Sequence, residues 1–430
     1  MERYFHSVTL DKNKCVGCTN CIKRCPTQAI RVRGGKAQIM TERCIDCGEC
    51  IRVCPHHAKK ARHDTLDKCK EFAYTVALPA PALYGQFNRL DDIDVVLTGL
   101  QALGFDEVFE VSRAAEIVSD ATRMLMNDGK LKKPVISSAC PAGGRLIRGR
   151  VSDLCDHVLP LKSPMEVAAM LARRQAVANS GLAPEQIGVF FISPCAAKVT
   201  DARSPIGIDS SEVDGVLAIS DIYPALLGKM NKLEQTAPLS HSGIIGVSWS
   251  YIGGEAAGLL NENHLAADGI DNVIKVLEEL EDEKLQELDF IELNACAGGC
   301  VGGIFTAENG YAARARIKRL RKYLPVSCNR LSDAGSTACM DWVHPLEYSP
   351  VMKLADNVTE AMRLMQEADD IGDRLPKLDC GACGAPTCRA LAEDVAKGLA
   401  RDTDCIFLMR QEIQRIAKQL STLRDNHDDT

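Results

Sequence analysis

Apolar and polar residues follow two different periods between about residue 71 and residue 293. Short apolar runs bounded by turn residues predict buried strands, and they lie at residues 75–78, 107–111, 134–138, 187–193, 216–219 and 290–293. Between these runs, apolar residues recur every three or four positions and predict helices at residues 91–104, 114–127, 163–179 and 272–288. Alternating strands and helices predict an α/β fold in which helices flank the sheets. Ligands of such folds bind at the carboxyl ends of the strands.

A cysteine follows three of these predicted strands, namely Cys140, Cys195 and Cys296. Cys300 follows Cys296 within the stretch ELNACAGGCVGG, whose glycines let the backbone pack against sulfur without Cβ clashes. Two thiolates at this spacing can converge on one metal cluster. The fold pattern and the cysteine positions therefore indicate the same place for a binding site, the edge of the sheet at the carboxyl ends of its strands.

The first 70 residues contain two copies of the motif C-x2-C-x2-C-x3-C-P, with a short hairpin expected at residues 30–39. This is the bacterial two-cluster ferredoxin motif, in which the fourth cysteine of each run ligates the other cluster. Structural zinc is the alternative, but zinc sites do not need the trailing C-x3-C-P. The motif predicts one [4Fe–4S] cluster on Cys15, Cys18, Cys21 and Cys54 and a second on Cys44, Cys47, Cys50 and Cys25.

A third cysteine motif, C-x2-C-x4-C-x16-C, lies near the end of the sequence, between helices expected at residues 356–368 and 407–423. It resembles the single-cluster [4Fe–4S] module of electron-transport subunits and corrinoid iron–sulfur proteins, while structural zinc stays open as an alternative. The last helix has apolar positions at Ile413, Ile416 and Leu420, which we expect to pack on its own domain or on a dimer partner. The predicted ligands are Cys380, Cys383, Cys388 and Cys405.

The size and the 20 cysteines of this 430-residue chain suit several metal-binding domains. We predict a ferredoxin domain over residues 1–70, a central domain over residues 71–350 and a small helical cluster domain over residues 351–430. Cys69 is expected to be a buried free thiol. Cys328 and Cys339 belong to no motif.

Charge is distributed unevenly along the chain. Residues 1–70 contain 15 Lys and Arg against 7 Asp and Glu, a net +8, so the other residues of this −7 chain carry −15. A basic shell would offset the charge of anionic clusters, or would dock an acidic electron carrier. The acidic pI of about 5.8 and few aromatic residues argue against nucleic-acid binding. No segment has the pattern of a membrane span or a signal peptide, so we expect a cytoplasmic protein.

The segments SSACP, SPCAAK and ELNACAGGCVGG resemble the three active-site motifs of [FeFe]-hydrogenases, in the same order and at similar separations. The resemblance implies that Cys140, Cys195, Cys296 and Cys300 hold the [4Fe–4S] half of an H-cluster. It also implies that Cys300 bridges to a two-iron subsite coordinated by CO, cyanide and an azadithiolate.

The same resemblance suggests which residues surround that subsite. Lys198 matches the family's lysine that donates to a cyanide, although a surface lysine is the alternative. Residues 80–82 resemble the backbone segment that receives the other cyanide. The cofactor-binding residues implied in this way are Ala80, Pro81, Ala82, Lys198 and Gly299.

Several positions depart from the catalytic members of that family. Ala139 replaces the cysteine that first accepts the proton, and loss of a positioned acid or base typically costs roughly 10²–10⁴ in rate. Ser193 and Asn294 replace methionines, and Asp201 replaces a glutamate. The segment that usually supplies two consecutive glutamates reads VSDA at residues 118–121. Compared with the catalytic members, this sequence keeps the four cysteines of the motifs (the cysteine cage) but changes the residues of the pocket and of the proton path.

This combination resembles the sensory [FeFe]-hydrogenases. It implies an oxidoreductase with slow, reversible H₂ oxidation and proton reduction that senses H₂ or redox state. Electrons would leave through the N-terminal or C-terminal clusters to a ferredoxin or a signalling protein, and the chain could form a homodimer.

Two other functions stay open. One is a catalytic hydrogenase subunit that exchanges electrons with ferredoxin and routes protons through Asn294, Ser193 or water. The other is an iron–sulfur protein for electron transfer or cluster assembly that lacks the two-iron subsite. Lys198 and residues 80–81 argue against this last function, because neither has a role without cyanides.

Overall fold

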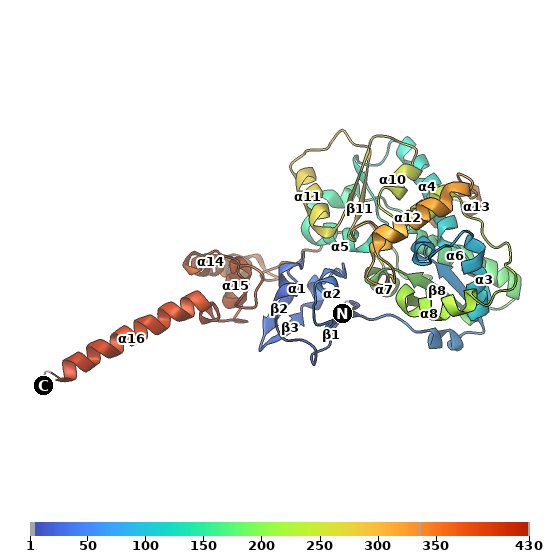
Figure 1. Cartoon of the computed structure of the whole chain (residues 1–430). Helices are drawn as coiled ribbons and strands as arrows, with labels where there is room; N and C mark the ends of the chain where they lie inside the picture. Colours follow the sequence, from blue (N-terminus) through green and yellow to red (C-terminus); the bar gives the residue numbers. More distant parts are fainter. Residues whose placement is uncertain (1–4, 335–336, 429–430) are drawn as a thin grey trace. The chain divides into compact units, whose positions relative to one another are not determined.

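The computed structural model describes residues 5–334 and 337–428 (Figure 1). The chain divides into two compact units. The first holds residues up to Val8, Ile45–Gly48 and Ala61–Ser349; the second holds Thr9–Cys44, Glu49–Lys60 and the residues from Pro350 onward. The predicted division into three domains stays a prediction, since most N-terminal cysteine-motif residues share a unit with the C-terminal residues.

A four-stranded parallel sheet forms one half of the first unit, with β8 next to β5 on one side and β9 on the other. All seven residues of β8 are buried, which is why its sequence is continuously apolar. The strand order is β6-β5-β8-β9, with bounds β5 (Tyr74–Pro79), β6 (Glu107–Val108), β8 (Ile187–Ser193) and β9 (Gly215–Ala218).

A second parallel sheet has three strands, β10 (His264–Asp268), β11 (Phe290–Asn294) and β7 (Val135–Ile136), with β11 in the middle. The sequence pattern did not predict β10. Its five residues are all only partly buried, so it lacks the apolar run that marks the other strands.

Helices of the first unit follow most of the strands and pack against them. They are α3 (Ile93–Leu103), α4 (Val111–Asn127), α5 (Pro141–Arg150), α6 (Pro164–Ser180), α7 (Ala196–Arg203), α8 (Ile219–Met230), α9 (Ile244–Ser248), α10 (Gly254–Gly258), α11 (Ile270–Glu281), α12 (Gly310–Leu320) and α13 (Leu331–Ala334). Several predicted bounds differ from the structure, and two of them have a clear physical reason. The strand predicted to reach residue 111 ends at Val108, because α4 begins at Val111. The helix predicted to reach residue 288 ends at Glu281, because Glu283 and Leu285 adopt left-handed backbone conformations.

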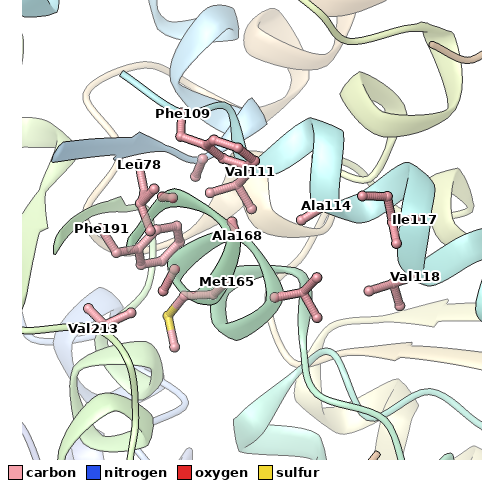
Figure 2. Close-up of a cluster of buried hydrophobic side chains, with 14 of the residues drawn as sticks. Leu78, Phe109, Val111, Ala114, Ile117, Val118, Met165, Ala168, Phe191 and Val213 are labelled. Carbon is pink, nitrogen blue, oxygen red and sulfur yellow. The ribbon is translucent and has the colours of Figure 1, made fainter. Parts of the chain in front are cut away.

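The main core lies where α4 and α6 pack against the four-stranded sheet. Figure 2 shows Val111 and Ile117 of α4, Met165 of α6, and Leu78 and Phe191 of β5 and β8 gathered in one apolar cluster. The face of α6 is rich in alanine, which allows close approach between helices. This packing fixes the carboxyl ends of β5 and β8. The predicted site residues Ala80 and Cys195 follow these two strands.

In the second unit, β2 (Ile30–Arg33) and β3 (Lys36–Ile39) form the predicted antiparallel hairpin, turning at Gly34 and Gly35, which both have positive φ. β1 (Val8–Leu10) pairs with β4 (Lys59–Ala61), and all residues of these two strands except Val8 and Ala61 belong to this unit. The helices are α1 (Asn20–Lys23), α2 (Glu49–Arg52), α14 (Val358–Arg374), α15 (Cys388–Ala396) and α16 (Ile406–Asp428). Among the described residues, none of the helices has both the length and the apolar character that crossing a membrane requires.

Candidate active site

The carboxyl ends of strands from both sheets open onto one cavity of about 100 Å³ in the first unit. Cys140 follows β7, Cys195 follows β8, and Cys296 and Cys300 follow β11. All four cysteines line this cavity, as does Ala80 at the end of β5. The site therefore lies between two sheets, and the sequence alone did not show that there are two.

Two of these cysteines also stand at helix N-termini. Cys140 is the N-cap of α5 and Cys195 is the N-cap of α7. The N-terminal end of a helix carries partial positive charge and favours an anionic sulfur. The hydroxyl of Ser193 accepts a hydrogen bond from the Cys195 backbone nitrogen at 3.0 Å and donates to its carbonyl at 3.1 Å. Ser193 thereby fixes the loop that carries Cys195.

Burial and crowding oppose ionisation of two of these thiols, Cys195 and Cys300. Burial raises the pKa of Cys195 to about 12, and the neighbouring thiols of Cys296 and Cys140 add to the increase. The pKa of Cys300 is raised well above its ordinary value, mainly by burial and then by Cys195 and Cys140. A bound metal cluster offsets this cost, because its positive charge stabilises the thiolate form. The donor set therefore fits an iron–sulfur cluster.

The loop of the third motif depends on glycine at two positions. Gly299 has φ +84°, and a Cβ there would lie 2.5 Å from the backbone nitrogen of Ile252. A Cβ on Gly303 would lie 2.1 Å from the carbonyl oxygen of Pro194. Contacts this short do not occur in real structures, so the loop that carries Cys300 reaches this position only with glycine.

Two buried glutamates line the same cavity, and the sequence analysis gave neither a role. Both carboxylate oxygens of Glu255, on α10, lie 2.7 Å from the donating hydroxyl of Ser137. Glu292, on β11, accepts hydrogen bonds from the backbone nitrogens of Gly253 at 3.0 Å and Ala256 at 2.9 Å. Glu292 was visible within ELNACAGGC, whereas Glu255 carried no signal because its burial arises only from the tertiary fold.

These two carboxyl groups differ in environment. Burial raises the pKa of Glu255 well above its ordinary value, and the charge of Glu292 raises it further. Burial also raises the pKa of Glu292, to about 6, although its backbone hydrogen bonds oppose the increase. Of the two carboxyl groups, Glu255 is therefore the one whose protonated form the site favours more.

Residues 73–254 and 255–304 match the family described as iron only hydrogenase large subunit, C-terminal domain, and they make up more than half of the chain. The chain belongs to this family. Residues 7–55 match a 4Fe-4S dicluster domain, and residues 375–407 match a family described as an Fe-S cluster. These matches support iron–sulfur cofactors in this protein.

The relatives are distant. Iron hydrogenase 1 of Clostridium pasteurianum is 25% identical over 372 residues, which cover 69% of this chain and 64% of that protein. The periplasmic [Fe] hydrogenase large subunit of Nitratidesulfovibrio vulgaris is 25% identical over 225 residues, which cover 46% of this chain and 52% of that protein. The chain thus spans about half to two thirds of the length of these relatives.

A solved [FeFe]-hydrogenase structure, described in terms of oxygen inactivation at its two-iron subcluster, has a TM-score of 0.51 at 15% identity. The alignment covers 67% of this chain and 97% of that one. This similarity concerns the fold, and it agrees with the predicted α/β class.

Most of the residues predicted to surround the family's two-iron subsite line the cavity. Ser193 is the exception, since its side chain is fully buried and bonded to the Cys195 backbone. The cavity-lining residues from the predicted set, besides the four cysteines, are Ala80, Pro81, Ala82, Ala139, Lys198, Asn294 and Gly299. Their roles toward a cofactor stay predictions.

Lys198 already has partners within the protein. Its ammonium group donates to the hydroxyl of Ser163 at 2.9 Å and lies 3.3 Å from the carboxylate of Asp201. Its side chain is 12% exposed. The positive charge of Lys198 is therefore balanced without a cyanide, and this weakens the argument that only a two-iron subsite explains this lysine.

The segment at residues 118–121 makes structural contacts. Val118 lies in the core, and the hydroxyl of Ser119 donates to Ala115 and accepts from the indole of Trp249 at 3.0 Å. Asp120 pairs with Arg123 at 3.0 Å. These side chains are engaged in helix packing and do not reproduce the paired glutamates of catalytic members.

The other predicted cluster ligands also gather in the second unit. Cys15, Cys18, Cys21 and Cys54 line one small cavity, and Cys380, Cys383, Cys388 and Cys405 line another. Cys25, Cys44 and Cys50 belong to this unit, while Cys47 belongs to the first. The individual ligand sets stay predictions.

Outside the motifs, Cys69, Cys155 and Cys328 are free thiols. Cys69 is half-buried, where full burial was expected, and burial raises its pKa to about 11. Cys328 is exposed and Cys339 is partly buried, and no disulfide joins them. Cys155, which the sequence analysis left unassigned, is buried in the core near α5.

Proposed function

We propose that this chain is a slow, H₂-responsive [FeFe]-hydrogenase that acts as a sensor of H₂ or of redox state. One observation carries the proposal: the four-cysteine cage is intact, while Ala139 occupies the adjacent position on the cavity wall. A methyl group cannot accept a proton, so the position that relays protons in catalytic members is inert here.

The residues around the cavity fit the two-iron subsite of the family. Lys198 and the backbone of residues 80–82 would hold its diatomic ligands, and Cys300 would bridge it to the cubane. When bound, the subsite supplies the chemistry that splits H₂ into protons and electrons, with the electrons reversibly accepted by iron. The apolar side chains of Val111, Met165 and Phe191 line the cavity and exclude water.

Glu255 is the group placed to hold a proton in place of the missing thiol. Glu255 itself lines the cavity, and Ser137 fixes its orientation, because Ser137 donates to Glu255 and accepts from the Ala139 backbone nitrogen at 3.2 Å. Ser137, unlike a thiol at position 139, is displaced from the cavity wall. Proton exchange through Glu255 would therefore be slower than through a thiol at position 139. A sensor can work at this slow rate, because it needs H₂ to bind at the site and does not need rapid turnover.

Electrons would pass between the cavity and the predicted iron–sulfur clusters, and then to a ferredoxin or a signalling protein. A homodimer is the arrangement that we propose for α16. Its residues Ile413, Ile416 and Leu420 are 59%, 44% and 59% exposed, so they do not pack on their own domain. With Ile406 and Met409 they follow the three- and four-residue spacing of a coiled-coil seam, which a second copy would match.

Two specific observations favour the alternatives. The Ser137–Glu255 contact favours a catalytic hydrogenase subunit, because it offers a proton route that needs no thiol. The pairing of Lys198 with Asp201 favours an electron-transfer or assembly protein without the two-iron subsite, because the lysine has a partner of its own.

The test of the proposed function is H₂ turnover of the matured protein and of its Ala139→Cys variant. We expect slow turnover in the native chain and an increase of roughly 10² or more in the variant, because the thiol restores a positioned acid and base. Fast turnover in the native chain would remove the chemical basis of the sensor. No increase in a fully loaded variant would show that Ala139 does not limit the rate.

A further inference from the structure

The C-terminal cysteine loop lies directly on the hairpin of the N-terminal dicluster region, within the second unit. The backbone nitrogen of Val32, on β2, donates to the carbonyl of Gly384 at 2.8 Å. Gly384 has φ +80°, and a Cβ there would lie 1.9 Å from the carbonyl oxygen of Val32. Only glycine permits this approach.

A buried ion pair fixes the same contact. Asp394, on α15, accepts from Arg31 at 2.6 Å and 3.1 Å and from Arg33 at 2.7 Å. The side chains of Arg31 and Asp394 are only 7% and 9% exposed. A bidentate pair at this depth has a fixed geometry, and either charge left alone would be strongly unfavourable. The ion pair therefore fixes the position of the hairpin relative to α15.

Cluster cysteines lie on both sides of this contact. On one side, Val32 lines the cavity formed by Cys15, Cys18, Cys21 and Cys54. On the other side, Gly384 directly follows Cys383, whose carbonyl accepts from Arg33 at 2.8 Å. A single hydrogen bond, from Val32 to Gly384, thus separates the wall of one predicted cluster site from the ligand loop of another.

The charges at the contact suit electron transfer as well as docking. Lys23, which lies between two predicted ligand cysteines, donates to the carbonyl of Pro386 in the same loop at 3.2 Å. Arg33 and Lys23 place positive charge beside the C-terminal loop, which favours the reduced, more negative state of a cluster there.

We propose that the C-terminal module carries a [4Fe–4S] cluster that exchanges single electrons with the cluster on Cys15, Cys18, Cys21 and Cys54, across the Val32–Gly384 contact. In each step one cluster loses an electron and the other gains it, and no proton or bond is exchanged. The C-terminal cluster is thus an end of the N-terminal relay and not a separate site. This inference deepens the proposed function and rests on its cluster assignments, but not on activity toward H₂.

The experiment is electron paramagnetic resonance of the full chain, reduced with dithionite and prepared without the two-iron subsite. The first variant is Cys388→Ala, which removes a predicted ligand and leaves Cys383 and Gly384, the residues at the hairpin contact, unchanged. We expect a loss of about four iron atoms per chain. We also expect narrower lines and slower spin relaxation in the remaining signal, because one neighbouring spin has been removed. The magnetic coupling between the two N-terminal clusters is the same in the native chain and in Cys388→Ala. It therefore does not contribute to the difference between their spectra.

The second variant is Gly384→Ala, which keeps all the ligands but forces the loop away from Val32. This variant should retain its iron, and its signal should show the same narrower lines and slower spin relaxation as that of Cys388→Ala. Asp373→Asn is the matched control, since Asp373 pairs with Lys377 on the exposed face of the same module. It should leave the spectrum unchanged.

Unchanged lines and relaxation in Cys388→Ala despite loss of iron would overturn the relay. The relay is also overturned if Gly384→Ala lowers the melting temperature but leaves the spectrum intact, because the contact would then be structural only. Retention of full iron in Cys388→Ala, with zinc found in the native module, would contradict it as well. None of these results depends on H₂ activity, so failure of the proposed function would be seen separately.

Discussion

The hydroxyl of Ser137 lies 2.7 Å from both carboxylate oxygens of Glu255, which lines the cavity that the four cysteines share. Ser137 also accepts from the backbone nitrogen of Ala139 at 3.2 Å. Ser137 thus holds the Glu255 carboxyl group in a fixed position beside the segment that carries Ala139.

We predict that Glu255→Gln lowers H₂ turnover by roughly 10² or more, because glutamine keeps the shape and hydrogen bonding but cannot transfer a proton. The measurement is dye-linked H₂ oxidation as a function of pH. Glu279→Gln on the exposed face of α11 is the control and should change nothing. An unchanged rate and pH profile in Glu255→Gln would mean that protons take another route.

The second prediction concerns the loop of the third motif. Gly299→Ala should abolish loading of the cubane at the cavity, because the new Cβ would lie 2.5 Å from the Ile252 nitrogen. Iron analysis should show a loss of about four iron atoms per chain while the other clusters remain. Gly298→Ala is a matched control, since Gly298 has the same φ of +84° but its Cβ would meet nothing closer than 3.9 Å. Equal loss in both variants would assign the effect to backbone strain and not to the close contact.

A third prediction follows from Glu166, which is buried on α6 and bonded to the hydroxyl of Ser211 at 2.6 Å. Burial, followed in the same direction by the charge of Asp201, raises its pKa from 4.5 to about 7. Above pH 4.5 the unfolded chain loses this proton while the folded chain keeps it. The stability contributed by this group therefore falls as pH rises from about 4.5 to 7, by about 3 kcal/mol in total.

Glu166→Gln removes this titration. The melting temperature of the variant relative to the native chain should increase between about pH 5 and pH 7 and then level off. Thermal unfolding followed by circular dichroism at a series of pH values measures this difference. A difference that stays constant with pH would show that Glu166 titrates alike in both states.

The fourth prediction concerns α16. Ile413→Glu places a charge in the middle of the exposed apolar stripe and should convert a dimer into a monomer, which light scattering after size exclusion would detect. Gln414→Glu adds the same charge beside the stripe and should leave the dimer intact. If the native chain already has the mass of one copy, the proposed homodimer is wrong.

Several features could be predicted from the sequence because local pattern and fold agree at those points. Ile187–Ser193 was predicted with its observed bounds, since a strand buried on both faces must be apolar throughout. The cysteines that follow β7, β8 and β11 were placed together because parallel strands present their carboxyl ends to one side.

Other features depend on tertiary contacts that a single sequence does not show. Glu255 looks like any charged residue of a short helix until the fold buries it against Ser137. The pairing of Lys198 with Ser163 required α6 and α7 to meet, and the division of the site between two sheets required β10 to be found. The docking of Gly384 on Val32 joins segments from opposite ends of the sequence.

We propose that the cavity holds a two-iron subsite that responds to H₂. An infrared spectrum of the matured protein, first under argon and then under H₂, tests it most directly. We expect carbonyl and cyanide bands that shift when H₂ is admitted. Absence of these bands, even after the synthetic subsite is supplied, would contradict it and leave an iron–sulfur protein that keeps only the cubane.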